Sequence, residues 1–123
     1  GETISLEIAN YNGNYAYGNT PKGIYRQETT VVGSFQVANT FGLYDMHGNV
    51  WEWCADNWHD NYEGAPTDGS AWIEPNITLP TLRGGSWSYI PHYCRSACRN
   101  YFNAVNRYAD IGFRVACSAR GLL

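Results

Sequence analysis

Residues 41–53 read FGLYDMHGNVWEW, and residues 83–87 read RGGSW. Four tryptophans lie in or near these two stretches: Trp51, Trp53, Trp58 and Trp87. Large aromatic side chains at this density form the core that lets a loop-rich domain hold its shape. We therefore expect all four to build the core around which the chain folds.

The composition indicates one globular domain over residues 1–123. The chain begins at Gly1 without an initiator methionine, so we expect an excised domain or the C-terminal part of a longer protein. The chain is 44% hydrophobic and 15% charged, which fits a folded domain and excludes a disordered one. It has 8 Lys plus Arg against 11 Asp plus Glu and no basic run, so we do not expect nucleic-acid binding through phosphates. No apolar run approaches the roughly 20 residues that span a bilayer, so we expect no membrane insertion. The sequence does not indicate a cellular location.

Short strands joined by long loops are expected, because glycine, tyrosine and asparagine are abundant and long helical periodicity is missing. The best strand candidates are rich in β-branched or aromatic residues, and they are residues 30–35, 49–54, 82–87 and 112–117. Residues 10–27 and 56–80 contain glycine and proline breakers and are expected to be irregular. Helix is expected only in short pieces.

The family resemblance rests on the two opening motifs followed by CRSA at residues 94–97 and GFRV at residues 112–115. In this order they resemble the formylglycine-generating enzyme family, also called the sulfatase-modifying-factor domain, over residues 8–117. The resemblance implies an α+β, irregular and loop-rich fold, namely the C-type-lectin-like fold of the formylglycine-generating-enzyme type. Arg83, Arg99 and Arg114 belong to these motifs, and we expect their guanidinium groups to hold carbonyls and carboxylates in place.

A structural calcium site is the first functional feature that the resemblance implies. Asp45 and Glu52 would supply carboxylates, while Gly48 and Val50 would supply backbone carbonyls, a hard-oxygen set that suits Ca²⁺. The alternative is that Asp45 caps a turn and Glu52 accepts backbone hydrogen bonds.

The oxidase centre of the family is the second feature. Its enzymes bind copper through two thiolates, an arrangement suited to Cu(I). Tyr89 stands at the position of the first cysteine and Cys94 at the second, so we expect no copper, no catalytic residues and no formylglycine generation. The four cysteines allow two disulfides in three pairings, and unpaired thiols are the other possibility.

The third feature is a resemblance of residues 88–111 to the variable region of bacterial proteins diversified by retroelements. In those systems template adenines are rewritten, so that AAC codons become NNC codons. Such codons cannot encode Lys, Glu, Gln, Met or Trp. None of these types occurs in residues 88–111, whereas residues 1–87 contain 15 of them. The alternative is an ordinary aromatic-rich loop.

A variable region over residues 88–110 implies a ligand-binding module whose ligand is a protein or another macromolecule of unknown identity. The expected contact residues lie between the scaffold positions: Ser88, Tyr89, Ile90, His92, Tyr93, Cys98, Tyr101, Phe102, Tyr108, Ala109 and Asp110. Tyrosine and serine suit such a surface, because they bring contact area and adaptable hydrogen bonds at low entropy cost.

Two other functions stay open from the sequence. One is an enzyme of the formylglycine-generating or sulfoxide-synthase type, although His47, His59 and His92 show no paired ligand spacing. The other is a sensor domain fused to a protease or a kinase.

Overall fold

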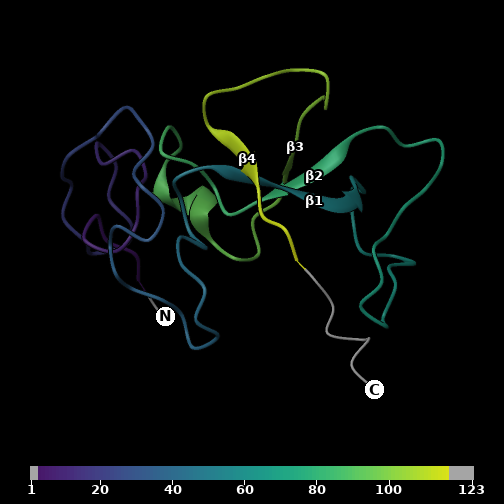
Figure 1. The fold of residues 1–123 in the computed structure, drawn as a ribbon, viewed down its shortest axis with the longest axis horizontal. Coiled ribbons are helices and arrows are strands. Elements are labelled where there is room, and N and C mark those ends of the chain that lie inside the picture. The colour runs from purple at the N-terminus through teal and green to yellow at the C-terminus, as the bar shows by residue number, and fades with distance from the viewer. Residues whose placement is uncertain (1–2, 117–123) are drawn as a thin grey trace.

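Four short strands form one mixed sheet at the centre of the molecule (Figure 1). A computed structural model describes residues 3–116 of the chain. The strands are β1 (Trp51–Asn57), β2 (Pro80–Arg83), β3 (Asn100–Tyr101) and β4 (Ile111–Phe113). Their order is β3-β2-β1-β4; β1 and β2 are antiparallel, β2 and β3 are antiparallel, and β1 and β4 are parallel.

Helical structure in residues 3–116 is limited to one 3-10 turn, η1 (Pro91–Cys94), which starts on a proline. Proline fits a helix start because its fixed φ is preorganised and its missing N–H is not needed there. No helix in this part of the chain is long and apolar enough to cross a membrane. The irregular, loop-rich architecture therefore agrees with the expected fold class.

The core lies where β1 meets β2 and the N-terminal loops. Trp51 and Leu82 are both 0% exposed, and Ala9, Tyr11 and Cys94 form a buried cluster beside them. Of the four tryptophans expected in the core, Trp51 is fully buried, and the other three are only partly buried.

Three of the four expected strands are present. The strand expected at residues 82–87 is observed as β2, which covers Pro80–Arg83 and is shorter than expected. It ends at Arg83 because Gly84 and Gly85 adopt φ values of +93° and +74°, which a strand does not accommodate. A Cβ on Gly85 would lie 2.8 Å from the sulfur of Cys94, so this close approach requires glycine. Of the range 112–117, residues 112 and 113 belong to β4 (Ile111–Phe113), residues 114–116 follow the strand, and Cys117 lies outside the described residues.

The strand expected at residues 30–35 was wrong, because this segment folds into a turn. The amide of Ser34 donates to the carbonyl of Val31, and Gly33 has a φ of +71°. The Asp45 carboxylate accepts the Gly33 N–H at 2.6 Å, which fixes the turn from a segment 12 residues away. The β-branched Val31 and Val32 are each 79% exposed.

The two long loops lie on opposite sides of the sheet in Figure 1. Residues 10–27 are irregular, as expected, and lie with the rest of the N-terminal segment on one side. The second loop starts at residue 58, because β1 continues to Asn57, and it returns to β2 at Pro80. The loop between β3 and β4 rises from the sheet between these two masses (Figure 1).

Candidate functional site

Residues 88–110 run from the turn after β2 through η1 and β3 and then through the exposed loop that enters β4 (Figure 1). Residues outside this segment hold its backbone at several points. The Asn12 amide donates to the Tyr89 carbonyl at 3.0 Å, and the Trp51 amide donates to the Asp110 carbonyl at 2.8 Å. The segment is therefore fixed at both ends and, through β3, in its middle.

Tyr89 and Tyr93 pack on the buried Trp51. Their ring centroids lie 5.4 and 6.3 Å from that of Trp51, and 5.3 Å from each other, all in edge-to-face arrangements, which aromatic pairs prefer. Burial, helped by the nearby Asp110 carboxylate, raises the pKa of the Tyr89 phenol. Tyr89 thus adds to the core, while Tyr93 keeps an exposed edge.

Ser88 and Asp110 form a polar contact that joins the two ends of residues 88–110. The Asp110 Oδ2 atom accepts hydrogen bonds from Ser88 Oγ at 2.6 Å and from Ser86 Oγ at 2.8 Å. Ser86 is 0% exposed, and a buried hydroxyl needs such a partner. Ser88 and Asp110 were predicted to contact ligand, and in the structure they belong to the frame, by which we mean the bonds that hold residues 88–110 against the rest of the domain.

The exposed members of the predicted set gather on η1, β3 and the loop before β4. They are His92, Tyr93, Tyr101, Tyr108 and Ala109. Tyr101 and Tyr108 are 43% and 42% exposed. The Phe102 ring lies 4.9 Å from that of Tyr108 and supports it from below the surface. Ile90 and Cys98 are half-buried and line a shallow hollow beside His92.

A stack of rings and one guanidinium joins β3 to the loop after β1. The Arg99 guanidinium lies 4.6 Å from the Trp58 ring centroid and 4.4 Å from that of Tyr62. The Tyr101 ring lies 4.6 Å from the Trp58 ring. Trp58 and Tyr62 thus border the exposed set. No local sequence pattern predicts this contact, because 41 positions separate Trp58 from Arg99.

The arginines of the family motifs act as expected. Arg99 donates to the His59 carbonyl at 2.9 Å, and Arg83 donates to the carbonyls of Ser96 and Cys98 and to the Tyr62 hydroxyl. These bonds hold the chain that leads into β3 against the rest of the domain.

The four residues expected to ligate calcium lie in one region, and its two carboxylates already have partners. Glu52 accepts a forked pair of hydrogen bonds from Arg114, the shortest at 2.7 Å, and Asp45 accepts the Gly33 amide. Hydrogen bonding to Glu52, with a further contribution from the charge of Asp45, raises the pKa of Arg114. Arg114 is therefore the ion-pair partner of Glu52, whereas Asp45 is bonded to the Gly33 amide. Gly48 and Val50 lie between them in the chain, and a calcium ion would have to draw Glu52 away from the guanidinium.

The thiols of Cys54, Cys94 and Cys98 differ in burial. Cys94 is buried, and burial together with Cys98 raises the pKa of its thiol to about 12. Cys54, Cys94 and Cys98 form no disulfide with one another. No group of three or more His, Cys, Asp or Glu side chains in residues 3–116 is placed to hold a metal ion.

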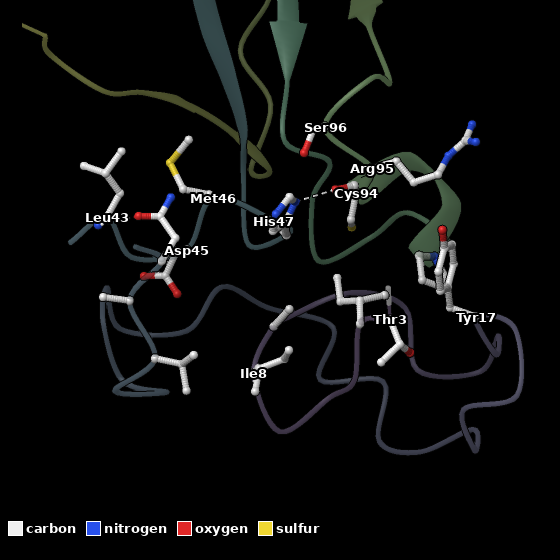
Figure 2. A pocket seen from close by; sticks show the side chains of 16 residues that line it. Thr3, Ile8, Tyr17, Leu43, Asp45, Met46, His47, Cys94, Arg95 and Ser96 are labelled. Carbon is white, nitrogen blue, oxygen red and sulfur yellow. Dashed lines mark hydrogen bonds between the residues drawn. The ribbon is translucent and has the colours of Figure 1, made fainter. Parts of the chain in front are cut away.

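A pocket of about 400 Å³ lies below η1, between the N-terminal segment and the segment before β1 (Figure 2). Apolar side chains such as Ile8 and Leu43 form much of its wall, and Asp45 and Arg95 add polar groups. The His47 ring bonds to the Cys94 carbonyl at 2.7 Å and closes the inner end. The pocket shares no residue with the eleven predicted contact positions, so it is distinct from their surface.

Comparison with known proteins gives a family match over residues 6–119, to the sulfatase-modifying factor enzyme 1-like domain. The chain is 37% identical over 97 residues to the formylglycine-generating enzyme of Mycobacterium tuberculosis, covering 70% of this chain and 32% of that enzyme. The first curated relatives are much longer than the chain, which spans 15% to 32% of their length.

Two solved structures are similar over most of the chain. PvdO from Pseudomonas aeruginosa has a TM-score of 0.73 and 46% identity, covering 92% of this chain and 40% of that one. Treponema denticola variable protein 1 has a TM-score of 0.61 and 29% identity, covering 87% and 34%. The expected C-type-lectin-like fold of the formylglycine-generating-enzyme type is confirmed, as is the resemblance to a variable protein.

Proposed function

Because the chain belongs to the sulfatase-modifying factor family, we propose that it uses the family fold as a ligand-binding module and not as an oxidase. Its binding surface is the exposed part of residues 88–110, and its ligand is a protein or another macromolecule. Similarity to Treponema denticola variable protein 1 supports this choice within the family.

One observation carries the proposal: the backbone of residues 88–110 is bonded to the rest of the domain, whereas several of the side chains are exposed. The backbone at Tyr89, Ser96 and Asp110 is bonded to residues outside the segment. The side chains of Tyr101, Tyr108 and Ala109 face solvent. Exchanging such side chains leaves the hydrogen bonds of the frame intact, which is what a surface that changes its ligand requires.

The residue at the position of the partner cysteine argues against the oxidase. Cu(I) is held by two thiolates in the resembling enzymes, and Cys94 would supply one of them. The position of the partner cysteine holds Tyr89, whose ring is packed against Trp51. Placing a second thiolate there would require a different core.

Deep sequencing of the 3′ end of the gene, across a population of the cells that carry it, tests the proposal. We expect substitutions confined to the nucleotides that align with adenines of AAC codons in the template copy, concentrated in the codons of the exposed residues Tyr93, Tyr101, Tyr108 and Ala109. The codons for residues 83–87 serve as the internal control and should not vary. A uniform sequence over residues 88–110 would overturn the proposal and return attention to copper binding at Cys94.

A further inference from the structure

Residues 58–63 leave β1 and come to lie beside β3, outside the segment that the variable-region resemblance covers. Four groups form the contact as a continuous series, Tyr62, Arg99, Trp58 and Tyr101, with neighbours 4.4, 4.6 and 4.6 Å apart. The Arg99 N–H also bonds to the His59 carbonyl. The loop is thereby fixed against the strand that carries Tyr101.

The two ends of this series face solvent, while its middle does not. Tyr62 is 60% exposed and Tyr101 is 43% exposed, whereas Trp58 and Arg99 are only partly exposed. A ligand held by Tyr101 would therefore meet Tyr62 on the neighbouring loop. Exposed tyrosines on fixed backbone are efficient binding anchors, because little entropy is lost when they are covered.

The loop that carries Trp58 and Tyr62 is acidic. Residues 58–79 contain four acidic residues and no Lys or Arg. Two of these acids adjoin the stack: Asp60 accepts the Trp58 Nε1–H at 3.1 Å, and Glu63 follows Tyr62 directly. Both are exposed. The two nearby cations, Arg83 and Arg99, donate to carbonyl oxygens and to the Tyr62 hydroxyl, or lie between rings.

We propose that residues 58–63 are a constant wall of the binding surface, at which Tyr62, Asp60 and Glu63 receive a lysine or arginine side chain of a protein ligand. The proposal rests on the proposed function, because the ligand is held mainly by the variable side chains. A cation is attracted both to the face of a tyrosine ring and to carboxylates beside it. The wall would give every variant a shared preference for basic ligands, while the variable residues select among them.

The test is a selection of displayed random dodecapeptides on the immobilised full chain, followed by affinity measurements on the enriched peptides. We expect enrichment of Lys and Arg, and binding that weakens as NaCl rises from about 0.05 to 0.5 M, because salt screens exposed charges. Glu63→Gln with Asp60→Asn should weaken binding about tenfold, equivalent to the loss of one well-placed ionic contact.

Glu7→Gln is the control, because it removes one exposed carboxylate from the N-terminal segment, and this segment and the loop between β1 and β2 lie on opposite sides of the sheet (Figure 1). It should change the affinity less than twofold. Tyr62→Ala should lose about tenfold, because the ring that receives the cation is removed. The melting temperature of each variant separates lost binding from lost folding.

The outcomes distinguish this inference from the proposed function. Two results would overturn the inference about the wall: selected peptides without basic enrichment, or peptides whose affinity is unchanged by Glu63→Gln with Asp60→Asn. The proposed binding function would nevertheless stand if Tyr108→Ala abolished the binding of these peptides. Peptides insensitive to both Tyr108→Ala and the wall variants would overturn both. A selection that enriches nothing would also count against the wall.

Discussion

Replacing Asp110 by alanine tests whether this residue belongs to the frame or to the ligand surface. Its carboxylate accepts two short hydrogen bonds, from Ser86 at 2.8 Å and from Ser88 at 2.6 Å. Its main-chain carbonyl accepts the Trp51 amide, and that bond does not depend on the side chain. The substitution therefore removes the contact that ties the two ends of residues 88–110 together and leaves the adjoining backbone bond in place.

The size of the effect follows from the burial of Ser86. A hydrogen bond to a charged acceptor contributes about 1.5–3 kcal/mol, and a buried donor left without a partner costs about 1–3 kcal/mol. Ser86 and Ser88 are 3.1 Å apart and can bond to each other, which recovers part of the loss. We expect Asp110→Ala to lower the free energy of unfolding by about 2–4 kcal/mol and the melting temperature by roughly 10 °C.

Urea unfolding of the full chain, followed by tryptophan fluorescence, measures this change. Asp110→Asn keeps one acceptor oxygen and should lose about half as much stability. Ala109→Ser is the control at the exposed neighbouring position, where substitutions typically stay within about 0.5 kcal/mol. If Asp110→Ala unfolds at the same urea concentration as Ala109→Ser, the carboxylate is not part of the frame, and it is free to contact ligand as the sequence suggested.

Two further predictions concern the thiols and calcium. Iodoacetamide at pH 8 should label half-exposed Cys98 at least about tenfold faster than buried Cys94, whose thiol stays protonated; equal rates by mass spectrometry would contradict this. The folded state keeps the Cys94 proton up to its pKa of about 12, whereas the unfolded state releases it above about pH 9. Stability should therefore fall by up to about 1.4 kcal/mol per pH unit over that window, an effect that Cys94→Ala should remove. Calcium at Asp45, Gly48, Val50 and Glu52 would raise the stability by about 2.7 kcal/mol at 100 times its dissociation constant. Glu52→Gln should abolish that gain, and an unchanged melting temperature at high calcium would exclude the site.

Strand positions were predictable where the signal was local. The aromatic Trp51 and Trp53 mark β1, and the branched Ile111 followed by Gly112 and Phe113 marks β4. β3 has only two residues, Asn100 and Tyr101, which is too short for any periodic pattern. It exists because β2 offers it an edge, and that information lies outside the segment.

The proposed binding surface followed from the sequence as a list of positions and not as a shape. Codon reasoning identified residues 88–110, but it could not separate Ser88, which is bonded in the frame, from Tyr108, which faces solvent. The separation depends on Ser86 and Asp110 meeting across 24 residues. The failure at residues 30–35 has the same origin, because Asp45 determines that turn from a distance.

The bonds of the frame are of the kind that the proposed function requires, because they hold a small domain with few regular elements together without depending on its exposed side chains. Its strands are short, so order depends on side chains that bond to backbone: Arg83 and Arg99 on carbonyls around β3, and Asp110 on serines at the entry to β4. A guanidinium that bonds to a carbonyl is indifferent to the side chain of the residue that supplies it. Variation at Cys98, Tyr101 or Tyr108 can then alter the contacts offered to a ligand while the frame keeps its partners. The limits of that tolerance should lie at positions such as Tyr89, whose ring packs against Trp51: there, a change of ligand contact would also be a change of core.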